Sequence, residues 1–427
     1  MLDIIRPGDG RYPLLRHVYG AQGSPAAIVR PRHAGEVADA LAFARRASGP
    51  FAIRSGGHGI SSISTNDGGT VIDLGALSAI ERTGDGLVRV GPGARWGQVA
   101  RTLQPWGLAI SSGDSGDVGV GGLATTGGVG LMGRAHGLTI DSIVSAQMVT
   151  ADGVMRTVSA EEHPDLFWAI RGAGANFGIV TEFTFRAAEV PGVVHATFGY
   201  AIADLAGFLN GWGDAVERAP REISAFLYVF GGEQPFAQAT VVYAGMDAAA
   251  AMHALAPFAG LPGIVGRHVE RTAYADILPA SGQSHAGRQT AIMRTGLAEH
   301  LGTGLASRLA ALAAAGVVEM LQIRSVGGAI NDVPASATAY AHRHQNFSVT
   351  AVATADPDVL DAAWSEVREL MDGMYLSFES SHRPEAVLRA FPSSTLARLR
   401  TLKAHWDPED VFDQNFDVGS SSRQDES

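Results

Sequence analysis

The segment RSGGHG at residues 54–59 constrains the fold most, because it places one imidazole, His58, between glycines. Glycine tolerates positive φ angles and has no Cβ, so the N–H groups of such a loop can turn toward phosphate oxygens. PFAIR (50–54) and GGTVIDL (68–74) are typical of short strands on either side of this loop.

The segment between these two strands distinguishes the loop from a Rossmann fingerprint. Residues 60–69, ISSISTNDGG, offer no convincing helix start, whereas the GxGxxG motif requires a helix directly after its glycines. Alone, the loop is equally compatible with a pyrophosphate cradle and with a tight turn around a hydrogen-bonded histidine. Other segments are needed to decide between these two interpretations.

Three further segments provide that context. Residues 116–143 form a second glycine-dense and apolar stretch, 171–185 run from glycines into a β-branched strand, and 396–418 end in QNFDV. Together with the RSGGHG loop they resemble the flavoprotein family of vanillyl-alcohol oxidase and p-cresol methylhydroxylase, in its berberine-bridge-enzyme-like branch. Within that branch the segments resemble in particular the bacterial 6-hydroxy-D-nicotine oxidase and the polyketide-tailoring oxidases, and the resemblance covers about residues 11–418.

The resemblance implies an α+β fold with two domains, the FAD-binding one being of the p-cresol methylhydroxylase type. Residues 1–190 would begin the FAD-binding domain and 378–427 would complete it, with a polar tail, GSSSRQDES, expected to be disordered. Residues 191–377 would form the substrate domain, an antiparallel sheet covered by helices. The pattern itself predicts a strand and an amphipathic helix within 26–48. It also predicts strands within 224–230, 238–245 and 319–330.

In that family the histidine of the RSGGH loop is bonded to the 8α carbon of FAD, which implies a covalent link through His58. Neutral imidazole is a nucleophile, so the attachment is chemically reasonable, and a noncovalent flavin contact is the alternative. Many relatives add a cysteine link at the position of Ser115. The chain contains no cysteine, so only a single covalent link is expected.

The remaining flavin contacts are also implied by the resemblance. Residues beside His58 would surround the pyrophosphate, a second set would line the ADP half, Ile179 would contact the adenosine, and Asn415 would lie near the isoalloxazine ring. Some of these glycines could serve only close strand packing. The pyrophosphate set is Arg54, Ser55, Gly56, Gly57 and Gly59, and the ADP set is Val118, Gly119, Gly122, Thr125 and Gly128.

Strand alternation within 319–330 places Gln322 and Arg324 on one face. In the relatives this strand faces the flavin, and the residue matching Gln322 is often a glutamate proposed as general base. Glutamine cannot take a proton, so either the base lies elsewhere or the substrate needs none. Arg324 could hold a substrate carboxylate or pair with a structural acid.

Other polar residues are candidates for the missing base. Each has a plain structural alternative: a tyrosine in an apolar strand usually packs with its hydroxyl satisfied, and a histidine beside Arg343 and His344 could lie at the surface. The candidates are Tyr228, Tyr243, His342 and Glu379.

Departures from the family pattern favour an apolar or aromatic substrate. Leu123 and Val129 stand where plant-type relatives carry histidine and tyrosine, and Thr395 and Leu396 were matched to their C-terminal asparagine–tyrosine pair. Fewer hydrogen-bonding groups disfavour a sugar. The position of Val118 tends to admit oxygen in relatives when it is small, which favours an oxidase.

Charge and composition exclude several other classes. Thirty-two basic and 43 acidic residues give a net charge of −11, which disfavours nucleic acid and an anionic membrane as partners. The absence of cysteine excludes disulfides and thiolate metal sites, and no metal is expected. Asp3, Pro7 and Asp9 interrupt any signal-peptide core, so a cytoplasmic location is expected.

The sequence thus predicts an FAD-dependent oxidase that moves a hydride from a C–O or C–N centre to the flavin, with dioxygen as the second substrate and hydrogen peroxide as product. One alternative is a flavin-dependent oxygenase or cyclase that tailors a secondary metabolite. Another is a flavin-binding protein without turnover. The sequence leaves the substrate and the oligomeric state open.

Overall fold

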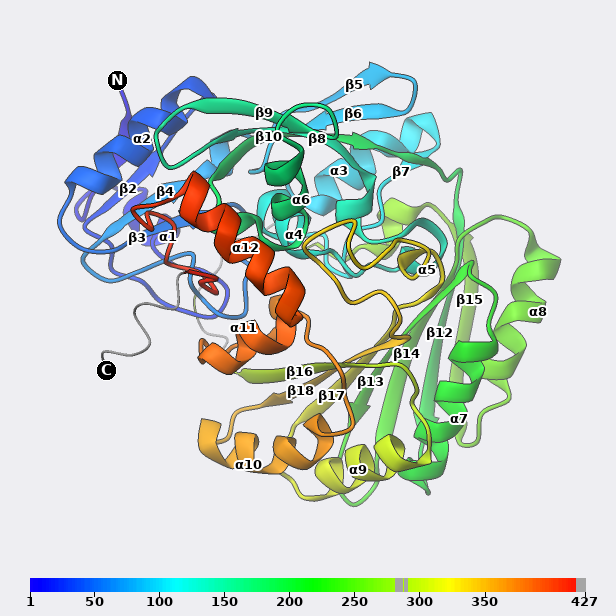
Figure 1. The fold of residues 1–427 in the computed structure, drawn as a ribbon. Coiled ribbons are helices and arrows are strands. Elements are labelled where there is room, and N and C mark those ends of the chain that lie inside the picture. Colours follow the sequence, from blue (N-terminus) through cyan, green and yellow to red (C-terminus); the bar gives the residue numbers. More distant parts are fainter. Residues whose placement is uncertain (281–286, 288–290, 420–427) are drawn as a thin grey trace.

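The computed structural model describes residues 1–280, 287 and 291–419 (Figure 1). Helices and strands are both abundant, and the sheets are mixed or antiparallel, which confirms the α+β class. The predicted disorder of the GSSSRQDES tail concerns residues that, from 420 on, lie outside the described part. Among the described residues, no helix has the length and apolarity needed to cross a membrane.

The N-terminal sheet holds the RSGGHG loop. Its strand order is β1-β2-β4-β3, and β3 and β4 are parallel neighbours although residues 55–69 between them, all described, contain no helix. The predicted strand, loop and strand are therefore confirmed. Helix α2 packs on this sheet through Val37, Ala40, Leu41 and Ala44, its predicted apolar face. The elements are β1 (Asp3–Ile5), α1 (Tyr12–Leu15), β2 (Ala27–Arg30), α2 (Gly35–Arg46), β3 (Phe51–Arg54) and β4 (Thr70–Asp73).

A second, five-stranded sheet carries the other two glycine segments. Its order is β5-β6-β10-β8-β9, with every pair antiparallel, and β7 pairs separately with β11. Its strands are β5 (Ile80–Gly84), β6 (Leu87–Val90), β8 (Ile143–Val149), β9 (Met155–Ser159) and β10 (Ile179–Arg186), and the pair is β7 (Leu108–Ala109) and β11 (Ala188–Glu189). The nearby helices are α3 (Trp96–Leu103), α4 (Val120–Thr126), α5 (Gly133–His136) and α6 (Pro164–Ala173).

A third, seven-stranded antiparallel sheet follows, with the order β15-β12-β14-β13-β17-β18-β16. Figure 1 shows its covering helices on the side away from the two N-terminal sheets. The three strands predicted here are confirmed as β13, β14 and β17. The strands are β12 (Val193–Ala201), β13 (Ile223–Phe230), β14 (Phe236–Tyr243), β15 (Ile264–Thr272), β16 (Ile292–Ala298), β17 (Met320–Ser325) and β18 (Phe347–Ala353). The helices are α7 (Leu205–Arg218), α8 (Ala248–Ala259), α9 (Thr303–Ala314) and α10 (Pro357–Arg368).

The faces of the seven-stranded sheet follow strand alternation. Leu321 and Ile323 point into the core beneath the helices, where they join Trp212 and Trp364. Gln322 and Arg324 therefore point to the opposite face, as predicted, toward the N-terminal part of the chain.

The C-terminal segment returns to the N-terminal sheets. Helices α11 (Pro384–Ala390) and α12 (Ser393–Trp406) lead to an irregular stretch whose Phe412 packs in the core of the first sheet with Val29 and Ile72. Lys403 fixes this stretch, since its Nζ lies 2.7 Å from Asp407 Oδ2 and 2.9 Å from the carbonyl of Phe412. Segments far apart in sequence thus build one core.

Candidate active site

A cavity of about 900 Å³ lies where the glycine segments meet the seven-stranded sheet. One part of its wall comes from the loop after β3 and from the glycine segments around α4 and before β10. The other part comes from β13, β17 and residues 375–378, and the tail contributes Gln414, Asn415 and Phe416. The cavity is therefore bounded by both predicted functional regions, the cofactor loops and the catalytic strand.

The two main glycine loops touch backbone to backbone. A Cβ at Gly56 would lie 2.4 Å from the amide nitrogen of Gly119, and a Cβ at Gly119 would lie 2.2 Å from the amide nitrogen of Gly56. Ser55 joins the same loops, because its Oγ accepts a 3.1 Å hydrogen bond from the Gly121 N–H and donates to the Pro92 carbonyl. Side chains are excluded from this contact, so the loops present their backbone to the cavity.

His58 lies in the wall of the cavity, next to Tyr19. The two rings stack face to face, with centroids 4.3 Å apart and planes inclined by 15°. Burial lowers the pKa of His58, so the imidazole is neutral at physiological pH. A neutral imidazole with one face covered is the form that can act as a nucleophile.

Strand pairing places two polar candidates side by side on the opposite wall. Tyr228 on β13 is the direct cross-strand partner of Gln322 on β17, and both line the cavity. Arg324 lies two residues further along β17, with its guanidinium 4.1 Å from the ring centroid of Phe378. Three of the predicted catalytic residues are thus brought together.

Asp114 connects these residues to the glycine loops. Its Oδ2 accepts hydrogen bonds from Tyr228 Oη at 3.0 Å and from Arg324 Nη2 at 2.9 Å. Burial raises the pKa of Asp114, but the Arg324 charge and the two donors outweigh burial, so the net pKa is lowered and the carboxylate stays ionised. Burial also raises the pKa of Tyr228, so its hydroxyl keeps its proton. The cavity therefore contains an ionised carboxylate that is not among the predicted catalytic residues.

Most of the predicted cofactor residues line the cavity, and two do not. The Arg54 guanidinium instead pairs with Asp73 at 2.6 Å and is 4% exposed. Gly128 packs against Thr139, and its N–H donates to Tyr375 Oη at 2.8 Å. The residues that line the cavity are Ser55, Gly56, Gly57, His58, Gly59, Val118, Gly119, Gly122, Thr125, Ile179 and Asn415.

Tyr243 and His342 lie away from the cavity. Tyr243 is paired with Ile223, so it shares the face of the sheet that packs against the helices. The His342 ring is buried, with Nε2 2.9 Å from the carbonyl of Ala390, so the surface position considered for it is wrong.

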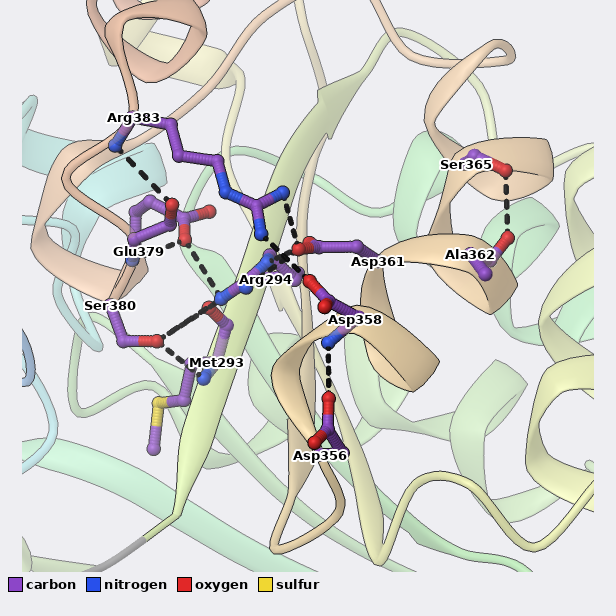
Figure 2. Close-up of polar contacts among 11 residues, drawn as sticks. Met293, Arg294, Asp356, Asp358, Asp361, Ala362, Ser365, Glu379, Ser380 and Arg383 are labelled. Carbon is purple, nitrogen blue, oxygen red and sulfur yellow. Dashed lines mark hydrogen bonds and ion pairs between the residues drawn. The ribbon is translucent and has the colours of Figure 1, made fainter.

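Glu379 directly follows the cavity residue Phe378 but belongs to a separate ionic cluster (Figure 2). Its Oε1 accepts a 3.3 Å hydrogen bond from Arg294, whose guanidinium also binds Asp361 at 2.5 Å. Glu379 is 1% exposed, and burial raises its pKa to about 7. The Glu379 side chain therefore faces the cluster and is not part of the cavity wall.

The C-terminal residues in the cavity wall differ from those expected, Thr395 and Leu396. Thr395 and Leu396 lie on α12 and do not line the cavity, whereas Asn415 and Phe416 do. The tail motif QNFDV, and not α12, therefore contributes these residues of the cavity wall. Tyr19, Tyr375 and Phe378 were missed because no motif contains them, whereas Asp114 adjoins Ser115 in a segment already singled out.

Comparisons with known proteins agree with this geometry. Residues 25–159 match the model of a family described as an FAD binding domain. The (R)-6-hydroxynicotine oxidase of Paenarthrobacter nicotinovorans is 29% identical over 97% of this chain and 96% of its own length.

Solved structures share the whole architecture. 6-hydroxy-D-nicotine oxidase from Arthrobacter nicotinovorans superposes with a TM-score of 0.86 at 25% identity, covering 98% of both chains. A berberine-bridge-enzyme-like protein of Physcomitrella patens gives 0.84 at 26% identity, covering 96% of this chain and 95% of its own. Xylooligosaccharide oxidase from Myceliophthora thermophila, solved with xylobiose, gives 0.86 at 25% identity over 98% of this chain and 97% of its own.

Proposed function

We propose that this chain is an FAD-linked oxidoreductase of the vanillyl-alcohol oxidase and p-cresol methylhydroxylase superfamily and that it oxidises a small apolar or aromatic molecule with dioxygen. The chemistry that bound FAD would supply is acceptance of a hydride from the substrate carbon and transfer of the electrons to dioxygen, with hydrogen peroxide as product. One observation supports the proposal above others: a single cavity joins the glycine loops and His58 to Tyr228, Gln322 and Arg324.

The residues present fit FAD. The backbone contact between Gly56 and Gly119 leaves no room for a Cβ, so no side chain at these two positions would stand between the loops and a phosphate group. His58 would hold the flavin through one covalent bond, because Ser115 and the absence of cysteine leave no second tether. Ile179 and Asn415 lie in the same wall, where they could contact the adenosine and the isoalloxazine ring.

The residues on the opposite wall would orient the substrate and take its proton. Asp114 is the ionised group nearest to Tyr228 and Arg324, and Gln322 can only donate or accept a hydrogen bond. We assign to Asp114 the acceptance of the substrate O–H or N–H proton as the C=O or C=N bond forms. Tyr228 and Arg324 hold the carboxylate in place, so its position is fixed before the substrate arrives.

The wall around these polar residues supports an apolar or aromatic substrate. Met293, Leu376, Phe378 and Phe391 line the cavity, and the ring centroid of Phe378 lies 4.1 Å from the Arg324 guanidinium. Leu123 and Val129 also line it and offer no hydrogen bond to a polyol. An aromatic alcohol or amine can pack against such a wall, whereas a sugar would leave hydroxyl groups without partners.

A substrate panel tests the proposal. The purified holoprotein is mixed anaerobically with aromatic alcohols, amines and oligosaccharides, and the oxidised flavin absorbance is followed. We expect bleaching with an aromatic compound and, in air, one hydrogen peroxide for each product molecule. Bleaching only by oligosaccharides would overturn the substrate class, and no bleaching would favour a binding protein without turnover. Oxygen-18 from dioxygen in the product would favour the oxygenase.

A further inference from the structure

Tyr19 covers one face of His58. The ring centroids are 4.3 Å apart and the planes are inclined by 15°, so the two π systems overlap. The Tyr19 N–H donates a 2.8 Å hydrogen bond to the carbonyl of Gly57, the residue before His58. Both rings line the cavity. Tyr19 is therefore tied to His58 through both its backbone and its side chain.

The segment that carries Tyr19 is itself anchored to the cofactor loop. His17 and Gln22 form a β-bridge on either side of Tyr19, and the Thr65 hydroxyl donates a 3.0 Å hydrogen bond to the Arg16 carbonyl. Thr65 belongs to the same loop, residues 55–69, as His58. The stack is thus held from both sides, and rotation of the imidazole about its Cβ–Cγ bond would break it.

We propose that Tyr19 is a positioning residue for the covalent attachment of FAD, an inference that rests on the proposed link at His58. In this step the imidazole nitrogen forms a bond to the 8α carbon of the flavin. One hydrogen leaves that carbon as a proton, the imidazole N–H leaves as a second proton, and the flavin keeps two electrons. Dioxygen removes these electrons with two protons and becomes hydrogen peroxide.

The stack favours this step for two physical reasons. It fixes the ring plane, so the nucleophilic nitrogen keeps one orientation toward the cavity. It also places the electron-rich face of a phenol against an imidazole that carries positive charge from the moment the new bond forms until the N–H proton leaves. Arg95 raises the electrostatic cost of that charge, whereas Asp114 and Asp117 lower it. A cation–π contact adds to the stabilisation at the ring face.

Attachment kinetics test the proposal. The full chain is produced under riboflavin limitation and mixed with FAD in air. Samples are quenched in acid, and intact mass then gives the fraction that carries FAD less two hydrogens. We expect Tyr19→Leu to attach FAD about 2- to 30-fold more slowly than the wild type, the range of one cation–π contact. Tyr19→Phe keeps the aromatic face and should attach at close to the wild-type rate.

Control variants separate this role from folding. Leu14→Ala, at an exposed position of the same segment, should attach normally, and His58→Ala should never gain mass. Pentafluorophenylalanine at position 19 keeps the ring shape but reverses its charge distribution, so it should slow attachment even if Tyr19→Leu does not fold. FAD fluorescence quenching measures noncovalent binding before attachment and should be similar in the slowed variants and the wild type.

Different outcomes would contradict the covalent link at His58 and the positioning role of Tyr19. If the wild type binds FAD and never gains its mass, the covalent link is wrong, and the role of Tyr19 fails with it. If the wild type gains the mass and both Tyr19→Leu and the fluorinated variant gain it at the same rate, the role of Tyr19 alone fails. Equal slowing by Tyr19→Phe would assign the effect to the hydroxyl and overturn the role of the ring face.

Discussion

Asp114 and Arg324, 210 residues apart in the sequence, meet at 2.9 Å in the wall of the cavity. Asp114 belongs to a glycine-rich loop and Arg324 to the central part of the seven-stranded sheet, so the pair joins the glycine loops to that sheet. Tyr228 donates to the same carboxylate oxygen. These contacts keep the Asp114 carboxylate ionised and fix its orientation.

Removing the Asp114 charge should slow flavin reduction strongly. We expect Asp114→Asn to lower the anaerobic reduction rate by about 10²- to 10⁴-fold, the usual contribution of a general base. Because the pKa of Asp114 is lowered, the wild-type rate should fall only when acidic pH protonates it. Stopped-flow spectroscopy measures the rate, and melting temperature reports whether Arg324 without its partner destabilises the fold.

Tyrosines on the two faces of the sheet provide a matched comparison for this prediction. Tyr228→Phe removes one donor to Asp114 and should slow reduction by roughly tenfold, since one hydrogen bond to a charged group contributes about 1.5 kcal/mol or more. Tyr243→Phe changes the opposite face and should leave the rate unchanged. Equal effects of the two substitutions would show that the cavity face of β13 takes no part in catalysis.

A carboxyl group at position 322 should add a new titration to the reaction. Gln322→Glu places an acid directly across from Tyr228, and we expect the flavin reduction rate to gain a pH-dependent step between about pH 5 and 8, absent from the wild type. Gln238→Glu adds the same charge on the same face at an exposed position and should not do so. An unchanged pH profile for Gln322→Glu would place the reacting atoms away from β17.

A methyl group at the contact between the glycine loops should loosen the cofactor site. A Cβ at Gly56 meets the backbone of Gly119 at 2.4 Å, so Gly56→Ala should destabilise the protein by about 1 to 3 kcal/mol and lower FAD content. Gly10→Ala is the matched control, because nothing lies within 4 Å of its Cβ and Gly10 does not line the cavity. Denaturant titration measures the stability of both variants, and the ratio of flavin to protein absorbance measures their FAD content. Equal stability of the two variants contradicts the close packing of the loops.

Glu379 should make stability depend on pH. Its pKa in the folded state is raised from 4.5 to about 7 by burial, since Arg294 is shared with Asp361 and Asp361 adds repulsion (Figure 2). The native state therefore holds this proton more tightly, and the resulting stability is full below pH 4.5 and is lost as pH rises through about 7. Relative to Glu379→Gln, the wild type should lose on the order of 3 kcal/mol of unfolding free energy from pH 4 to 8.

The comparison of two variants isolates this contribution, because other acids titrate over the same range. Asp358→Asn, at an exposed position of the same cluster, should follow the wild type at every pH. Urea titrations at pH 4, 6 and 8 give the three curves. A constant difference between Glu379→Gln and the wild type would mean that folding does not shift the pKa of Glu379.

Local patterns in the sequence predicted the elements around the site. The strands on both sides of the RSGGHG loop and the shared face of Gln322 and Arg324 depend only on alternation within a few residues. Most of the residues that the motif resemblance assigned to the cofactor line the cavity, although many other residues line it too. Their roles toward FAD stay predictions.

Features that depend on distant partners could not be predicted in the same way. Tyr243 and Tyr228 both lie in apolar strands, and only the register between β13 and β14 puts them on opposite faces. The position of Asp114 depends on its ion pair with Arg324, and that of the Tyr19 ring depends on its stacking against His58. A single sequence contains no signal for such pairings, because each depends on tertiary packing.

The return of the C-terminal segment has a consequence for biosynthesis. Asn176, in the cavity wall, accepts a hydrogen bond at its carbonyl from Lys403 and at its side chain from the Val418 N–H, and Asn415 completes the same wall. A ribosome must therefore release almost the whole described chain before the cofactor pocket closes. We therefore expect FAD to bind after translation, once the C-terminal residues complete the wall of the cavity.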